Sequence, residues 1–212
     1  VKNRVSHTNP LVMGHEASGT VHAIGPSVKN LQPGDAVAIE PGFGCRICSK
    51  CKAGKYNLCP EMKFAANPPY THGTLSKFFK VPADCCYKIS GSFDSEFGNA
   101  GGIGLDEAVL IEPMAVAVHS VRQVGVKPGD RVIVFGAGTV GLLCAAVARE
   151  FGANLIVSVD LSDDKLEFAK KFVGEDRVRF RTAIPAQGLN SEENAVGLRG
   201  WLKCVDPDAD LP

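Results

Sequence analysis

Hydrophobic and polar residues alternate in short runs along the first half of the chain. Such runs occur at residues 18–24 and 35–39, and a Pro33-Gly34 turn signal stands before the second run. No long helical period appears in residues 1–104. Because period-two alternation bounded by turn residues is typical of half-buried strands, this half is predicted to form a β-barrel or a β-sandwich.

A second pattern begins near Asp106, where segments of helical period alternate with apolar strands. The strand–helix–strand–helix–strand order predicts a parallel sheet with right-handed crossovers. Ser162 is expected to cap the last of these helices and Gly174 to end it, whereas residues 183–212 are weakly patterned. The expected helices are 106–123 (with Pro113 as a kink or a start), 136–151 and 163–173, and the expected strands are 131–135, 154–160 and 178–182.

The composition is that of an ordinary globular protein and excludes several classes. The 212 residues are 45% hydrophobic and 22% charged, which excludes a disordered chain. The 23 basic and 23 acidic residues give a net charge of +0, so neither a nucleic acid nor a membrane surface is an expected partner. No apolar run reaches the roughly 18 residues of a membrane helix, and no signal segment follows Val1. We therefore expect a cytoplasmic protein.

The spacing Cys45-x2-Cys48-x2-Cys51-x7-Cys59 is the strongest chemical signal in the sequence. In a reducing compartment, four closely spaced cysteines are better explained as metal ligands than as disulfides. Four thiolates on a short segment can surround one Zn²⁺ tetrahedrally, and a closed shell of four sulfurs makes such a zinc structural. An iron–sulfur cluster, free thiols and a zinc module for nucleic acid are the alternatives.

The run of residues 136–141, GAGTVG, fits the G-x-G-x-x-G pattern of dinucleotide-binding sites. It follows an expected strand and opens an expected helix, and Asp160 lies 19 residues past Gly141, at the end of the next strand. Gly136 would allow the tight turn, Gly138 the approach of the pyrophosphate, and Gly141 the packing of helix on strand. The Asp160 carboxylate would accept hydrogen bonds from the adenosine ribose and repel a 2′-phosphate, which favours NAD over NADP. The alternative is a glycine turn that serves packing alone.

The segment Gly14-His15-Glu16 places an imidazole beside a carboxylate just before an expected strand, and both groups are accepted zinc ligands. A His–Glu pair of this kind is more often an ordinary surface or core pair. Glu112 stands in the apolar step 110–113, where a buried carboxylate requires a partner; its alternative role is that of a helix-start carboxylate. A second, open metal site at these three residues is therefore one hypothesis beside their ordinary roles.

Several motifs together resemble the medium-chain, zinc-containing alcohol dehydrogenase family, and in particular its polyol branch of sorbitol, xylitol and L-arabinitol dehydrogenases. The resemblance runs from Pro10 to Val173 and fades after that. The motifs are GHEASG at 14–19, the cysteine segment, FAANPPY at 64–70 with GTL at 73–75, EPMAVAVH at 112–119, and GAGTVG at 136–141.

This resemblance implies a partial GroES-like β-barrel followed by a partial Rossmann domain with a doubly wound parallel sheet, which is an α/β fold added to a β fold. The expected domains are residues 1–116, with the zinc lobe at 44–60, and residues 117–212. Because members of this family are usually tetramers or dimers, a homo-oligomer is expected.

The resemblance also implies two zinc sites and a substrate pocket. A structural zinc would sit on the four cysteines of the lobe. A catalytic zinc would use His15 and Glu16, with Glu112 as an outer ligand or as the holder of a zinc-bound water. Phe78 would form an aromatic wall of the substrate pocket, which Glu112 is also expected to face.

For the cofactor, the resemblance places Thr139 and Val140 at the pyrophosphate turn, and Asp160 and Lys165 at the adenosine ribose. The implied reaction is a zinc-assisted transfer of a hydride from a polyol, such as xylitol or sorbitol, to NAD, which gives a ketose.

The sequence departs from the family at two places. No cysteine precedes His15, where the family supplies a further ligand of the catalytic zinc, and the chain stops at Pro212, before the second half of the dinucleotide fold. We therefore expect a chain truncated at both ends. The alternative function is a catalytically incompetent zinc- and dinucleotide-binding module that acts in structure or subunit interaction.

Overall fold

The computed structural model describes residues 5–67, 71–89, 102–174, 179–186, 188 and 190–205, without the side chains of 202, 204 and 205. The chain divides into two compact units, Val1–Glu112 and Pro113–Pro212, and each is described by itself. The functional domain limits expected from the sequence, 1–116 and 117–212, remain a prediction. Pro68, Pro69 and Tyr70 of the quoted motif lie outside the described residues, as does Val178 of an expected strand.

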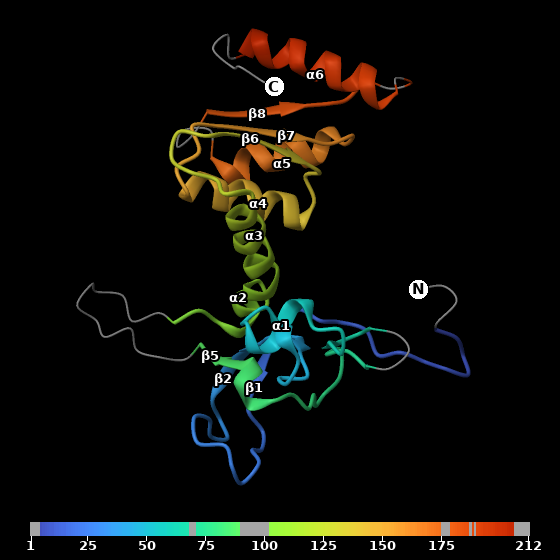
Figure 1. The fold of residues 1–212 in the computed structure, drawn as a ribbon, viewed down its shortest axis with the longest axis vertical. Helices are drawn as coiled ribbons and strands as arrows, with labels where there is room; N and C mark the ends of the chain where they lie inside the picture. Colours follow the sequence, from blue (N-terminus) through green and yellow to red (C-terminus); the bar gives the residue numbers. More distant parts are fainter. Residues whose placement is uncertain are drawn as a thin grey trace, which may run out of the picture. The chain divides into compact units, whose positions relative to one another are not determined.

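The first unit is built on a three-stranded antiparallel sheet in the order β1-β2-β5 (Figure 1). Its strands are β1 (Ala17–Thr20), β2 (Ala36–Ile39) and β5 (Cys86–Lys88), and β2 lies in the centre, with Val37 and Ala38 almost fully buried. The short helix α2 (Leu105–Ala108) contacts β1 and β2, and the Ser18 hydroxyl donates to the Leu105 carbonyl at 2.6 Å. Both strands expected in the first 40 residues are therefore present, although β1 ends at Thr20 rather than at residue 24.

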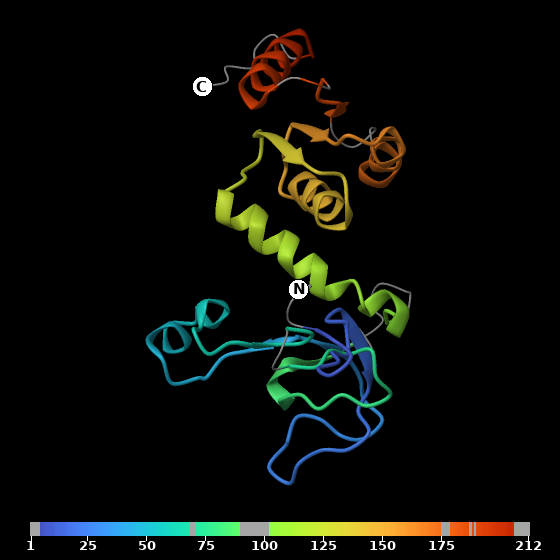
Figure 2. The ribbon, with the colours of Figure 1, turned by 90° about the vertical axis from the view of Figure 1, so that its right-hand side faces the viewer.

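A second, two-stranded ladder of this unit carries the cysteine segment. Strand β3 (Gly42–Phe43) pairs antiparallel with β4 (Lys63–Phe64). The intervening residues form helix α1 (Ser49–Lys52) and the 3₁₀ turn η1 (Tyr56–Leu58), and a second 3₁₀ turn, η2 (Ala83–Cys85), precedes β5. Figure 2 shows this lobe, in cyan, extending from the sheet at the end of two adjacent extended segments.

The second unit contains the expected parallel sheet, in the order β6-β7-β8. Its strands are β6 (Arg131–Phe135), β7 (Leu155–Val159) and β8 (Arg179–Ala183), and all five residues of the central strand β7 are buried. Helices α4 (Thr139–Glu150) and α5 (Asp163–Val173) pack on one face with Ile156 and Phe180. Helix α6 (Ser191–Val205) covers the other face, seen in red in Figure 1.

One expected helix is divided in two. The sequence predicts a single helix over 106–123, but α2 ends at Ala108 and α3 (Ile111–Val124) begins three residues later. Proline lacks the N–H that would bond the carbonyl four residues earlier, and its ring would clash there. Pro113 therefore falls in the first turn of α3, where no intrahelical N–H bond is needed.

Helix α6 lies in the tail whose pattern is weak. Its start is a reciprocal cap: Asn190 Oδ1 accepts the N–H groups of Glu192 and Glu193 at 3.0 and 2.9 Å, and Glu193 Oε2 accepts the Asn190 N–H at 2.9 Å. Leu198 and Trp201 pack onto the sheet face formed by alternate residues of β7. The Asn190-x-x-Glu193 spacing was the available signal, whereas two glycines inside the helix weaken its apolar period.

Phe180 offers a test of this core. It is 0% exposed on β8, so Phe180→Ala should lower the free energy of unfolding by about 3–5 kcal/mol through lost burial and a cavity. The matched control is Phe168→Ala, because Phe168 on α5 is 55% exposed and should cost about 1 kcal/mol or less. Urea unfolding followed by circular dichroism measures both, and equal losses would contradict the arrangement of the sheet.

Candidate metal centres and dinucleotide site

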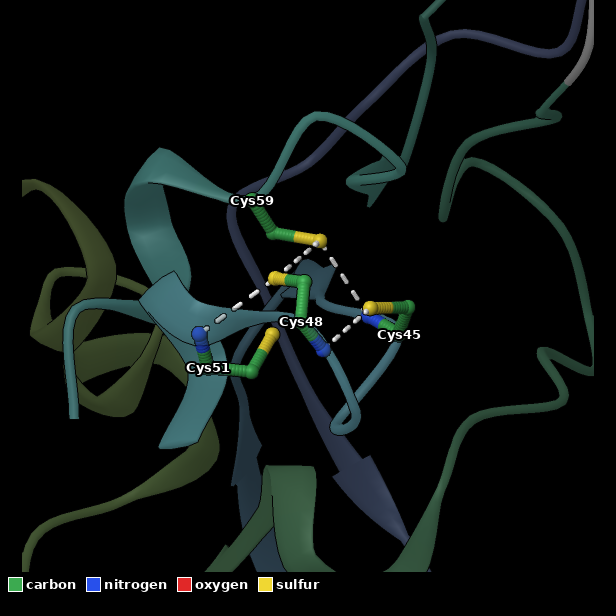
Figure 3. A group of neighbouring side chains, drawn as sticks. All are labelled: Cys45, Cys48, Cys51 and Cys59. Atoms are coloured by element: carbon green, nitrogen blue, oxygen red, sulfur yellow. Dashed lines mark hydrogen bonds between the residues drawn. The ribbon is translucent and has the colours of Figure 1, made fainter. Parts of the chain in front are cut away.

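The four cysteine side chains of the lobe converge on one point. Cys45 precedes α1, Cys48 caps its N-terminus, Cys51 lies within it, and Cys59 follows η1. Their sulfur atoms all lie within 4.8 Å of one another (Figure 3). The structure therefore brings together the four residues that the spacing predicts as one ligand set.

Backbone N–H groups surround these sulfurs. The Cys45 N–H donates to Cys59 Sγ at 3.3 Å, the Cys48 N–H to Cys45 Sγ at 3.4 Å, and the Cys51 N–H to Cys48 Sγ at 3.4 Å. The Arg46 N–H donates a hydrogen bond to the Cys51 sulfur. Each of the four sulfurs therefore accepts a backbone hydrogen bond. The N–H groups of Ile47 and Cys48 lower the pKa of the Cys45 thiol to about 7. Burial has the opposite effect on Cys51 and raises the pKa of its thiol to about 12, although the Arg46 N–H lowers it. The N–H donors therefore favour the thiolate, the form that binds metal, most clearly at Cys45.

The loop closes around the sulfurs so tightly that residue 44 has no room for a side chain. A Cβ on Gly44 would lie 2.7 Å from Cys51 Sγ and 3.2 Å from Cys59 Cβ. The loop therefore leaves the four sulfurs close together, and four cysteine sulfurs within 4.8 Å of one another are a donor set that fits one zinc ion.

Side chains outside the predicted ligand set hold the lobe to the sheet. Glu40, just after β2, accepts a hydrogen bond from the Tyr87 hydroxyl of β5 at 2.8 Å. It also bonds the Tyr56 hydroxyl of the lobe, which raises the pKa of Tyr56 to about 12. Arg46 pairs with Asp84 at 2.6 Å, although both side chains are exposed and such a pair adds little stability. No periodic or motif signal marks these residues, because they meet only in the folded chain.

The second group consists of His15, Glu16 and Glu112. One ligand atom from each lies within 4.8 Å of the others, although 96 residues separate Glu16 from Glu112 in sequence. His15 and Glu16 are exposed just before β1, and Glu112 is half-buried in the first turn of α3. Burial and the neighbouring Glu16 carboxylate raise the pKa of Glu112, while His15 lowers it. The geometry offers a nitrogen and two carboxylates on a solvent-accessible site.

Phe78 lies in a different set of contacts. Its ring centroid is 4.8 Å from that of His22, and Lys77 Nζ lies 5.6 Å from the ring. The His15 ring instead approaches Phe64 of β4, with centroids 5.4 Å apart. The predicted role of Phe78 as a substrate wall therefore stays a prediction.

The glycine turn joins β6 to α4. Gly136 has φ +94°, a value that L side chains rarely adopt. Gly138 is the N-cap of α4, so Thr139 and Val140 form its first turn, where N–H groups are free for an anion. A Cβ on Gly141 would lie 1.8 Å from the Gly136 carbonyl oxygen. Gly141 is thus required by the close approach of the helix to the turn itself, and less by its contact with the strand.

Asp160 follows β7 and reaches back to this turn. Its Oδ2 accepts the Ala137 N–H at 2.8 Å, and its Oδ1 accepts the Ser162 N–H at 3.0 Å. These hydrogen bonds, and Lys165 Nζ at 3.9 Å, lower the pKa of Asp160. Asp160 thus lies against the glycine turn, with Lys165 next to it, and their contact with the adenosine ribose stays a prediction.

Comparison with known proteins adds to this geometry. A family model described as the alcohol dehydrogenase GroES-like domain matches residues 1–91, and one described as the alanine dehydrogenase/PNT C-terminal domain matches residues 112–197. The two matches fall on the sheet unit that carries the cysteine lobe and on the parallel-sheet unit, respectively. The expected fold class, a GroES-like part followed by a Rossmann-like part, is confirmed.

Relatives and solved structures agree with these matches. The chain is 54% identical over 165 residues to a probable D-xylulose reductase A of Arthroderma otae, covering 78% of this chain and 43% of that protein. It is 51% identical over 164 residues to D-xylulose reductase A of Aspergillus niger, covering 77% and 43%. The crystal structure of galactitol-1-phosphate dehydrogenase from Escherichia coli is 28% identical with a TM-score of 0.74, over 94% of this chain and 52% of that one.

The chain spans about half the length of the curated relatives it matches, 43% of each of the two just named. Within the part of the chain that the structure describes, no helix is both long and apolar enough to cross a bilayer.

The close approach of Gly141 to the Gly136 carbonyl can be tested by measuring the stability of the ligand-free chain. Gly141→Ala should lower the free energy of unfolding by more than about 2 kcal/mol, because the added methyl collides with a backbone carbonyl that cannot move aside. The matched control is Gly138→Ala, where a Cβ meets nothing within 4 Å and the loss should be at most about 1 kcal/mol. Thermal and urea unfolding of the ligand-free chain measure both; equal stability of the two variants would disprove the close approach.

Proposed function

Because the chain belongs to the zinc-containing medium-chain alcohol dehydrogenase family, we propose that it is part of an NAD-dependent polyol dehydrogenase. The reaction would transfer a hydride from a polyol such as xylitol to NAD and give a ketose. The reverse reaction would reduce a ketose, which is the activity that the names of its relatives state. The observation that carries the proposal is the convergence of His15, Glu16 and Glu112 within 4.8 Å in such a chain.

We assign the structural metal to the lobe. Cys45, Cys48, Cys51 and Cys59 would hold one Zn²⁺ with a closed set of sulfurs, leaving no position for substrate. The converging N–H donors support this assignment because they stabilise the negative charge on the sulfurs that accept them. Binding of this kind would contribute local folding energy to a lobe with little apolar core.

The reacting site is assigned to His15, Glu16 and Glu112. Zinc, when bound there, supplies a Lewis acid that polarises an alcohol oxygen. His15 and Glu16 would supply ligand atoms from the exposed side. Glu112, half-buried with a raised pKa, would take the outer position or hold a water or the substrate hydroxyl, and Phe78 would line the substrate pocket.

The dinucleotide is assigned to the second unit. The free N–H groups at the start of α4 would bind the pyrophosphate beside Gly136, Gly138, Thr139, Val140 and Gly141. Asp160 and Lys165 would contact the adenosine ribose, and the Asp160 carboxylate would disfavour the 2′-phosphate of NADP. A cytoplasmic location and a dimeric or tetrameric assembly belong to the same proposal.

The function is tested by turnover and by metal counting on the same purified chain. With zinc present, xylitol and NAD should produce NADH, followed by its absorbance, and elemental analysis should find two zinc ions per chain. His15→Ala should abolish NADH formation and remove one zinc while the cysteine lobe keeps the other. One zinc per chain, NAD binding and no turnover with any polyol would instead favour a non-catalytic zinc- and dinucleotide-binding module.

The structural metal site has its own test. Gly44→Ala pushes a methyl to 2.7 Å from Cys51 Sγ, so the variant should lose the lobe's zinc much as Cys51→Ser does. The matched control is Gly25→Ala, because a Cβ there meets nothing within 4 Å. Zinc content after gel filtration is the measurement. A Gly44→Ala chain that retains as much zinc as the control would contradict a closed four-sulfur shell.

A further inference from the structure

The backbone just before His15 is tied down by one distant segment. The carbonyls of Val12, Met13 and Gly14 accept the N–H groups of Gly73, Leu75 and Thr74 at 2.7, 2.9 and 2.9 Å, respectively. All three peptide carbonyls that lead into the His15–Glu16 pair are therefore satisfied by residues 73–75, about 60 positions further along the chain. These bonds come from neither α2 nor the strands of the main sheet.

The two segments cross at a distance that only glycine permits. A Cβ on Gly73 would lie 2.3 Å from the carbonyl oxygens of both Met13 and Gly14, which are backbone atoms that cannot rotate away. Gly73 is buried, whereas its neighbour His72 is exposed. The crossing therefore fixes the backbone position of Gly14, and with it the position from which the His15 side chain extends.

The His72 side chain adds a further hydrogen bond to this crossing. Its Nδ1 lies 3.1 Å from the Val12 N–H and accepts it, so every hydrogen-bonding group of the Val12 backbone is paired with residues 72–73. The acceptor role requires a ring nitrogen with a free lone pair. An asparagine Oδ1 can replace such a nitrogen, whereas a methyl group cannot.

We propose that residues 72–75 are a positioning segment for the His15–Glu16 pair, with His72 and Gly73 as its positioning residues. The inference rests on the proposed metal site at His15, Glu16 and Glu112. An imidazole and a carboxylate on adjacent residues can meet one ion only if their shared backbone is held in place, because each side chain brings two or three free torsions of its own. The segment 72–75 supplies that constraint through its bonds to the backbone of residues 12–14.

The test uses the whole chain with three substitutions: His72→Ala, His72→Asn, and the control His119→Ala, an exposed histidine that bonds Gln123 within its own helix. Two quantities are measured. The first is amide hydrogen exchange of peptides covering residues 11–16 in the metal-free chain. The second is Co²⁺ affinity at the second site, titrated into protein whose cysteine lobe already holds Zn²⁺.

His72→Ala should speed exchange in residues 11–16 about fivefold and weaken the second metal site by a similar factor, which is the scale of one lost hydrogen bond. His72→Asn should restore both to within about twofold of the unchanged chain, and His119→Ala should alter neither. This rescue separates positioning from general stability, because an unfolding effect would not respond to where the acceptor atom lies. Gly73→Ala should speed exchange and weaken Co²⁺ binding more than His72→Ala does.

The outcomes distinguish the inference from the proposed function. Unchanged exchange in His72→Ala overturns the positioning role by itself, whatever the metal does. Faster exchange with unchanged Co²⁺ affinity also overturns it, because the order of the backbone would then be irrelevant to the site. Absence of any second metal in the unchanged chain defeats the proposed metal site and the positioning role together.

Discussion

The glycine turn and the His15–Glu16 site are both built where two stretches of backbone approach more closely than a side chain would allow. At Gly141 the first turn of α4 lies against the Gly136 carbonyl, and at Gly73 the chain crosses the carbonyls of Met13 and Gly14. At the Gly73 crossing, backbone hydrogen bonds also prevent the two segments from separating. At both places steric contact prevents the segments from moving closer. This constraint fixes the position of the backbone from which the functional groups extend.

The cysteine lobe depends on electrostatics for a related reason. Its larger apolar side chains are exposed, Ile47 by 76% and Leu58 by 56%, so burial cannot hold it together. N–H groups directed at sulfur favour thiolates, and four thiolates around a divalent ion leave a net negative charge. Four basic residues of the same segment offset that charge: Arg46, Lys50, Lys52 and Lys55. A metal ion would therefore replace the apolar core that the lobe lacks.

The sequence predicts those parts of the fold whose signals are local. Strand β6 and helix α5 have the predicted bounds, and Ser162 caps α5 as expected, because periodicity and capping act within a few residues. The sequence predicts a kink or a start at Pro113 but not two separate helices, and it does not predict α6, because glycines interrupt the helical period there. The ligand groups could be listed from spacing and resemblance. The contacts that position them could not, since Glu40 meets Tyr56, and His72 meets Val12, only through the tertiary fold.

Asp160 shows how closely binding and folding are connected in the second unit. Its two carboxylate oxygens already accept the N–H groups of Ala137 and Ser162, so a ribose hydroxyl would bind to oxygens that also hold the turn. Because these bonds lower its pKa in the folded chain, their stabilisation is fully present above the unfolded value of 3.8 and is lost as the pH falls through the folded value. Replacing Asp160 would therefore disturb the glycine turn and the choice between NAD and NADP together. A loss of NAD affinity in such a variant identifies a ribose contact only if the ligand-free chain keeps its turn.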